Sequence, residues 1–556
     1  MHRTKSTFRP RVIGLSFTRK IFIMKHLLTI SLLIIWKVVH ATDPYPRNEA
    51  IDIRHYQFNL VLNDTTDRIS GEATIDIRFR KEVTSFDLDL ASRQGDQGME
   101  VISVTSQGQS IHFTHENNRI TITIPRSAAN EDRSFTIRYA GIPQDGLIIG
   151  KNKFGDRTFF GDNWPNRAHY WLPVIDHPYD KATCEFRVVA PEAYSVIATG
   201  KKMEESALPD RQKLTHWKTS VALPTKVMVI GVARFAISYV GTINGVPLES
   251  WVYPQNREEG FSDYAPAAKP LDFISKTIAP YPYEKLANVQ SKTRFGGMEN
   301  AGNIFYYEKS VSGKGNIEGL LAHEIAHQWF GDSASEADWF HVWLSEGFAT
   351  YLANVYFENT YGPERMRQEM DKDRTQVLNY YVKNPRPIVD QQITDITKVL
   401  NTNTYQKASW VLHMLRQEVG DPKFWEGVRA YYQKFKLDNA LTDDFRSVME
   451  EVTGSNLKAF FDQWIYSSGH PVLEVTWTWL PAQKKIRITV VQQQEKLFQF
   501  PMEFGVLVNG SQTIEKTAVT NRKQEILLNA AQKPTSLQLD PLTHLLFQGT
   551  AKEVVK

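Results

Sequence analysis

Hydrophobic and polar residues alternate with a period of two from Ile51 to about Tyr253. This period is typical of strands that bury one face, and turn-forming Asn, Asp, Gly and Ser residues separate the runs. The pattern predicts a large β domain, with Cys184 as a small buried residue in one of its strands. The clearest alternation is found at residues 56–62, 73–79, 86–90, 120–124 and 135–139.

The period changes near Pro254, and from there to residue 468 the apolar residues mostly recur with the spacing typical of helices. Gly420 is predicted to end one helix, and Thr442 is predicted to be the N-cap of another. The stretch therefore predicts a mainly helical domain. Its downstream helices are expected at 318–330, 344–360, 363–383, 404–419, 422–436, 442–453 and 456–466.

After Gly469-His470-Pro471 the period of two returns, which predicts a small β-sandwich. The predicted fold class is therefore a multidomain α+β protein. Its parts are an N-terminal β-sheet domain at 42–253, a mainly helical domain at 254–468 and a C-terminal β-sandwich at 469–556.

Residues 1–41 carry eight Lys or Arg residues and no acidic residue. A basic region at Met24-Lys25-His26 precedes the apolar run 27–36 and the small residue Ala41, which is the order of a secretory signal peptide. We predict that Met24 is the true start, that residues 1–23 are an upstream extension, and that cleavage follows Ala41. The alternative is a membrane anchor, but the apolar run is too short to span a bilayer comfortably.

This signal predicts export to the periplasm or the extracellular space, with no stable membrane span after its removal. The whole chain has a net charge of +3, and loss of the eight basic residues leaves an excess of five acidic ones. Such a chain has no basic excess for binding nucleic acid. Its 42% hydrophobic and 23% charged residues are ordinary for a soluble globular protein, and they do not indicate an oligomeric state.

The candidate chemistry lies on one predicted helix and the helix after it. His323 and His327 are four residues apart, so two imidazoles project from one helix face and can bind one metal. Catalytic zinc usually takes three protein ligands, and Glu346 is the candidate third. Glu324 is then a possible general base. The alternative is a core helix with two hydrogen-bonded histidines, but an otherwise apolar helix needs a strong reason to bury them.

Three motifs follow one another along the chain. Gly296-Gly297-Met298-Glu299-Asn300 comes first, His323-Glu324-x-x-His327 followed by eighteen intervening residues and Glu346 comes second, and Tyr405-Gln406-Lys407 comes third. Together they resemble the GAMEN, H-E-x-x-H and Tyr-x-Lys motifs of the zinc aminopeptidases related to aminopeptidase N and leukotriene hydrolase, which are gluzincin metallopeptidases. The resemblance covers about residues 50 to 545.

The resemblance implies a thermolysin-like catalytic domain that holds one zinc ion per chain through His323, His327 and Glu346. Metal-activated water would attack the peptide bond with Glu324 as the general base. By the same resemblance, the Tyr405 hydroxyl donates a hydrogen bond to the carbonyl oxygen as negative charge develops there.

The resemblance also implies the class of substrate. Glu299 is expected to grip the free α-amino group, and the glycines beside it let the substrate backbone approach. The expected substrates are therefore peptides with a free N-terminus. Gly297 replaces the commoner Ala, and Ser345 stands where many relatives have Asn before the ligand Glu. The substrate-facing Gln of the family is not placed in the loop at 162–164.

Two other functions stay open. One is a catalytically silent scaffold on the same fold, although the complete set of ligands, base and Tyr argues against it. The other is a zinc endopeptidase or an epoxide hydrolase, although an endopeptidase has no use for Glu299 as an amine-binding group. The chain is expected to be a bacterial-type exported member that lacks the C-terminal helical domain of many relatives.

Overall fold

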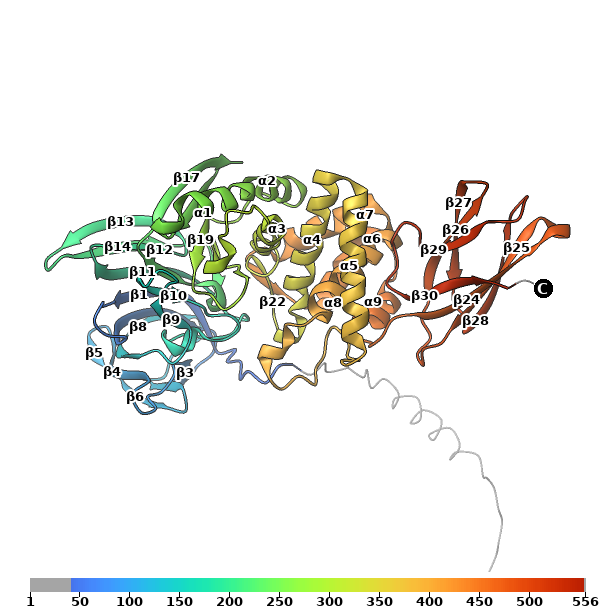
Figure 1. The fold of residues 1–556 in the computed structure, drawn as a ribbon. Helices are drawn as coiled ribbons and strands as arrows, with labels where there is room; N and C mark the ends of the chain where they lie inside the picture. The colour runs from blue at the N-terminus through green and yellow to red at the C-terminus, as the bar shows by residue number, and fades with distance from the viewer. Residues whose placement is uncertain (1–41, 555–556) are drawn as a thin grey trace, which may run out of the picture. The chain divides into compact units, whose positions relative to one another are not determined.

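The protein is described from a computed structural model that covers residues 42–554 in its described part. The predicted signal peptide, its cleavage after Ala41 and the start at Met24 lie outside the described residues. Within residues 42–554, no helix is long and apolar enough to cross a membrane. Figure 1 labels the α-helices and many of the strands.

The first part of the chain is built from β-strands, as the period of two predicts. Its main sheet has the order β13-β14-β11-β1-β2-β8-β4-β5, with β15 beside β11. Cys184 lies buried on β11, as expected. The strands of this sheet are β1 (Ile51–Val61), β2 (Ile69–Phe79), β4 (Gly98–Ser106), β5 (Gln109–Ser110), β8 (Glu131–Ile142), β11 (Lys181–Pro191), β13 (Lys201–Leu208), β14 (Gln212–Lys218) and β15 (Leu223–Pro224).

Two smaller sheets complete this part, with the orders β12-β16-β10-β9 and β3-β7-β6. Between β10 and β11 runs a long segment that contains the short 3-10 helix η1 (Ala168–Tyr170). The strands are β3 (Ser85–Asp89), β6 (His112–Glu116), β7 (Arg119–Thr123), β9 (Leu147–Lys151), β10 (Arg157–Gly161), β12 (Ser195–Ala198) and β16 (Ile230–Ala233).

A mixed sheet with the order β17-β18-β19-β21-β20 supports the candidate site. Strands β18 and β19 pair in parallel, so the sheet joins segments from both sides of residue 253. The short strand β20 lies at its edge and carries two residues of the GGMEN motif. The strands are β17 (Ala236–Ile243), β18 (Val246–Val252), β19 (Leu286–Ser291), β20 (Gly297–Met298) and β21 (Asn303–Tyr307).

The helical part follows the predicted spans to within a few residues at each end (Figure 1). A π-helical turn, η8 (Asn403–Lys407), leads directly into α6. The helices are α1 (Arg257–Tyr264), α2 (Ala268–Thr277), α3 (Glu318–His327), α4 (Trp343–Tyr361), α5 (Pro363–Tyr381), α6 (Ala408–Val419), α7 (Asp421–Phe435), α8 (Thr442–Thr453) and α9 (Lys458–Trp464).

The prediction of Thr442 as an N-cap is wrong. Leu441 occupies the cap position of α8, and its N–H donates to the Asp444 carboxylate at 2.8 Å. The Thr442 hydroxyl instead lies 2.8 Å from both His341 Nδ1 and Trp343 Nε1. The Thr442 side chain therefore forms tertiary hydrogen bonds, whereas local sequence rules predict that it caps the helix.

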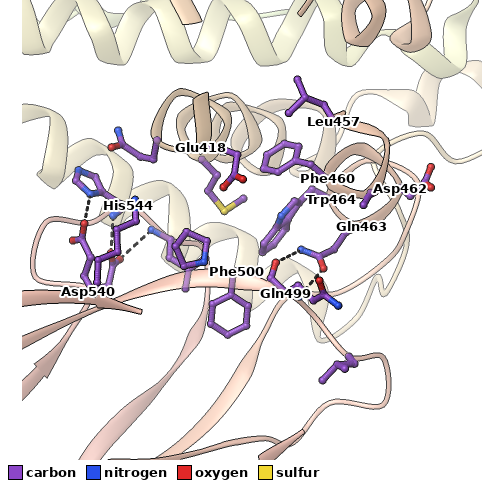
Figure 2. Close-up of a pocket in the computed structure, with 18 of the residues that line it drawn as sticks. Glu418, Leu457, Phe460, Asp462, Gln463, Trp464, Gln499, Phe500, Asp540 and His544 are labelled. Carbon is purple, nitrogen blue, oxygen red and sulfur yellow. Dashed lines mark hydrogen bonds and ion pairs between the residues drawn. The ribbon is translucent and has the colours of Figure 1, made fainter. Parts of the chain in front are cut away.

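The last part of the chain forms two sheets, with the orders β28-β25-β24-β30 and β27-β26-β29. A cavity of about 460 Å³ lies between helices α6 and α9 and strand β26, and Figure 2 shows Phe460, Trp464 and Phe500 around it. None of the predicted catalytic residues lines this cavity. The strands are β24 (Val472–Leu480), β25 (Lys485–Gln492), β26 (Phe500–Val508), β27 (Ser511–Val519), β28 (Lys523–Asn529), β29 (Ser536–Leu539) and β30 (Gln548–Glu553).

A buried ion pair joins the N-terminal strands to the helical part. Lys226, on the short helix η2 (Thr225–Val227), lies 2.6 Å from Glu336 on β22 (Ala334–Glu336), which pairs with β23 (Asp438–Ala440). Both side chains are almost completely buried. Burial opposes the charge on Lys226, but the carboxylates of Glu336, Glu299 and Asp332 together outweigh it and hold the pKa of the amine above its ordinary value.

Replacing Lys226 by Met is expected to lower the free energy of unfolding by about 3–5 kcal/mol, because it leaves Glu336 charged and unpaired in the interior. Denaturation in urea measures the change. The double variant Lys226→Met/Glu336→Leu, which removes both charges, should recover most of the loss. A single variant as stable as the parent would show that this pair does not hold the two parts together.

Candidate active site

The two histidines lie on α3, whose other side chains are mostly apolar and buried. Because they are one helical turn apart, both imidazoles reach the same point, with His323 Nε2 and His327 Nε2 3.1 Å apart. His327 is buried and His323 is partly exposed, so the pair faces a cavity from the core side. The helix therefore presents two imidazole nitrogens toward one open position.

Glu346 completes the group from α4, which packs against α3. Its Oε2 lies 3.4 Å from His323 Nε2 and 3.2 Å from His327 Nε2. These three separations suit a tetrahedral zinc ion with ligand bonds near 2.0–2.1 Å, for which ligand atoms stand about 3.3 Å apart. Among residues 42–554, Glu346 Oε2 is also buried without a hydrogen-bond partner. The residues thus fit the metal that the sequence predicts.

Ser345 supports the second imidazole. Its Oγ lies 3.0 Å from His327 Nδ1, and the Phe330 carbonyl oxygen lies 3.2 Å from the same nitrogen. Such contacts orient a ligand histidine and fix which nitrogen faces the metal. The Ser that replaces the commoner Asn therefore still contacts the ligand.

Glu324 is buried beside the ligands and packs against the GGMEN segment. A Cβ atom added at Gly297 would stand only 2.3 Å from Glu324 Oε1, so the glycine leaves the space that this carboxylate occupies. Burial raises the pKa of the Glu324 carboxyl well above its usual range; His327 opposes the rise, while Glu299 and Glu346 add to it. A basic carboxylate of this kind suits proton transfer.

Tyr405 enters the site from the π-helical turn η8. Its ring stacks on that of His323, with centroids 5.9 Å apart and an angle of 12° between the planes. Burial raises the pKa of the Tyr405 hydroxyl well above its usual range, and the Glu346 carboxylate raises it further. The phenol therefore stays protonated and can donate a hydrogen bond.

Glu299 is buried next to the candidate base. Carboxylate oxygens of Glu299 and Glu324 and a ring nitrogen of His327 all lie within 4.8 Å of one another. Glu299 Oε1 has no hydrogen-bond partner within the described residues. An unpaired buried carboxylate is costly, so its position is suited to a cationic group of a ligand.

Gln328 holds the GGMEN segment against the zinc helix, a role that sequence patterns did not indicate. Its Nε2 donates to the Glu299 carbonyl oxygen at 2.6 Å and to Asp332 Oδ2 at 3.0 Å. Its Oε1 accepts from the Gly302 N–H at 2.8 Å and from the Tyr281 hydroxyl at 3.0 Å. The amide nitrogen and the amide oxygen of Gln328 thus each have two hydrogen-bond partners within the protein. These hydrogen bonds fix the backbone of Glu299.

Replacing Gln328 by Leu is expected to lower kcat/KM on free-amine peptides about 10–100-fold, because the buried carbonyl of Glu299 and the N–H of Gly302 lose their partner. Zinc content should not change, since the four hydrogen bonds of the Gln328 side chain go to Tyr281, Glu299, Gly302 and Asp332 and not to a proposed ligand. Steady-state kinetics and metal analysis test this. Gln433→Leu, on the exposed face of α7, is the matched control and should behave like the parent. An unchanged kcat/KM for Gln328→Leu would reject the positioning role.

One cavity of about 320 Å³ brings the predicted site residues together. The exception is Asn300, which is buried behind the cavity and does not line it. Sequence reasoning missed other lining residues, including Trp164 from the segment before η1. The lining residues are Trp164, Phe295, Gly296, Gly297, Met298, Glu299, Leu320, His323, Glu324, His327, Glu346, Thr350, Leu400, Tyr405 and Gln406.

Two protein-family models match the chain. Residues 53–227 match the Peptidase M1 N-terminal domain, and residues 265–464, a range that includes the candidate ligands His323, His327 and Glu346, match the Peptidase family M1 domain. This chain belongs to peptidase family M1.

Two curated aminopeptidases are similar to this chain in sequence. Glutamyl aminopeptidase of Bos taurus is 29% identical over 336 residues, 56% of this chain and 34% of that protein. Probable aminopeptidase 1 of Sulfurisphaera tokodaii is 25% identical over 501 residues, 86% of this chain and 59% of that protein. The chain spans about half the length of the curated relatives it matches.

A solved M1 zinc metallopeptidase from Deinococcus radiodurans has a similar fold, with a TM-score of 0.64 and 24% identity. The similarity covers 76% of this chain and 95% of that one. At this identity it bears on the fold alone. The predicted α+β class, with an N-terminal β part, a helical catalytic part and C-terminal β-strands, is confirmed.

Proposed function

We propose that this protein is a zinc-dependent aminopeptidase that hydrolyses the N-terminal peptide bond of peptides. The observation that carries the proposal is the Glu299 carboxylate, which lies in the same cavity as His323, His327 and Glu346 and whose buried Oε1 has no hydrogen-bond partner in the described part of the chain. A set of three metal ligands alone is compatible with any zinc hydrolase. A buried carboxylate beside it adds a reason to bind a substrate through its terminal amine.

In this proposal His323, His327 and Glu346 hold one zinc ion per chain. When bound, zinc acts as a Lewis acid toward a peptide carbonyl and lowers the pKa of water. Glu324 accepts a proton from the attacking water and returns it to the leaving amine. The neutral Tyr405 hydroxyl donates a hydrogen bond to the carbonyl oxygen as its negative charge grows.

The position of Glu299 decides which bond is cut. A protonated α-amine paired with this carboxylate fixes the first residue of the peptide. The first peptide bond then lies over the metal ligands, because Glu299 is within 4.8 Å of Glu324 and His327. Gly296 and Gly297 present no side chains that would obstruct the substrate backbone.

The test compares a peptide that has a free N-terminus with the same peptide acetylated there. We expect release of single N-terminal residues from the free peptide and almost no cleavage of the acetylated one, since acetylation removes the charge that Glu299 binds. Mass spectrometry of the products distinguishes the outcomes. Equal rates or internal cleavage would replace the proposal with an endopeptidase, and no cleavage by zinc-loaded protein would favour a silent scaffold.

Zinc is expected at one ion per chain in the purified protein, held by the two-His, one-Glu group. Removal by a chelator should abolish turnover, and added zinc should restore it. Metal analysis beside activity measures both. Activity that persists in metal-free protein would contradict the assignment.

The composition of residues 1–41 supports export to the periplasm or the extracellular space as a further part of this proposal. N-terminal sequencing of the exported protein is expected to begin after Ala41. An intact Met1 in the exported protein would reject it.

A further inference from the structure

One wall of the active-site cavity is apolar and aromatic. The adjoining rings of Trp164 and Phe295 form it, and Leu400 lines the same cavity from a third segment of the chain. The Trp164 and Phe295 rings meet edge to face with centroids 6.1 Å apart, and Trp164 also packs on Trp339 at 5.5 Å. Phe295 directly precedes the segment that carries Glu299, so this wall adjoins the proposed amine site.

No Lys or Arg is among the described residues that line this cavity. Its charged lining side chains are the carboxylates Glu299, Glu324 and Glu346, apart from the two histidines. An acidic substrate side chain placed there would meet other carboxylates and apolar rings. Such a charge loses its hydration without gaining a cationic partner.

Two arginines beside Phe295 are already paired with carboxylates. Arg167 lies over the Phe295 ring at 5.7 Å, and its Nη2 lies 3.2 Å from the buried carboxylate of Asp162. Arg294 Nη1 donates to Asp145 at 3.0 Å. Each guanidinium therefore has a carboxylate partner within the protein, although the buried Arg167 Nη2 makes no hydrogen bond among the described residues.

We propose that this cavity selects a neutral, bulky apolar or aromatic first residue and rejects an acidic one. The selecting residues are Trp164, Phe295 and Leu400. This inference rests on the proposed aminopeptidase function, because Glu299 must hold the amine for the first side chain to reach the wall. The selectivity differs from the one in the name of the glutamyl aminopeptidases among its relatives.

The experiment uses the zinc-loaded full chain and a set of peptides that differ only in the first residue: Leu, Phe, Ala, Lys or Glu. We expect kcat/KM for Leu and Phe to exceed that for Glu by at least about 100-fold. Cleavage of the Glu peptide at the highest efficiency would overturn the inference and leave the aminopeptidase proposal intact. Cleavage of none of the five would instead reject the aminopeptidase proposal itself.

Two variants test the wall directly. Phe295→Ala should lower kcat/KM for the Phe peptide about tenfold or more relative to Ala, because the ring that packs on it is lost. The matched control is Phe154→Ala, a partly exposed Phe that does not line the cavity. Leu400→Arg places a cation in the cavity lining and should raise the Glu-to-Leu efficiency ratio about tenfold.

The main competing explanation is that Arg167 receives an acidic first residue after leaving Asp162. In that case the Glu peptide would be preferred by the parent, and Arg167→Gln would remove the preference. If the Phe295 and Leu400 variants keep the parent order of all five peptides, the wall does not select the first residue and the inference fails.

Discussion

Replacing Glu324 by Gln is expected to lower kcat about 10²–10⁴-fold while the protein keeps its zinc. The amide has the size of the carboxylate but cannot accept a proton from water. The metal ligands His323, His327 and Glu346 are unchanged by the substitution. Steady-state kinetics on a free-amine peptide, together with metal analysis of the same preparation, measures both parts.

Glu318→Gln is the matched control, because Glu318 lies on the first turn of the same helix and outside the cavity. It should keep nearly the parental kcat. Substantial turnover by Glu324→Gln would remove Glu324 from the role of general base. Loss of zinc from this variant would show instead that the carboxylate contributes to metal binding.

The second large effect is expected for Glu299→Ala, which should lower kcat/KM on free-amine peptides about 10²–10³-fold. The loss follows from removing the charged partner of the substrate amine in a buried site. Zinc content should stay at the parental level. Paired assays with free and acetylated peptides measure the effect, since the small rate on the acetylated peptide should change little.

Glu299→Gln separates charge from shape, because it keeps the side-chain size and removes the charge. It should lose most of the efficiency that Glu299→Ala loses. If both variants lose equal factors on free and acetylated peptides, Glu299 acts on the structure of the site and not on the amine.

Much of the fold could be predicted because burial imposes a period on the chain. Strand β1 alternates buried and part-exposed residues over most of its length, and α3 buries most of its residues. The H-E-x-x-H spacing likewise fixes two imidazoles on one helical face before any tertiary contact is known. Glu346 could be predicted from the spacing of a motif that the family shares.

The missed residues act through tertiary contacts that have no local pattern. Gln328 reaches partners on the GGMEN segment and in the loop before β19, and a single glutamine in a helical run does not indicate this. Trp164 reaches the cavity from a long segment without regular structure. Local rules predict Thr442 as a cap, but its hydroxyl forms hydrogen bonds with the buried side chains of His341 and Trp343, which are distant in the sequence.

The parallel pairing of β18 with β19 limits how the molecule can be divided. A fragment that began at Pro254 would keep every metal ligand but lose β17 and β18, and β19 would have an unpaired edge. Exposed apolar strand edges of this kind recruit other chains and promote aggregation. Any shortened form intended to carry the zinc site must therefore start before Ala236. That start lies inside residues 42–253, which the sequence pattern assigns to the β domain.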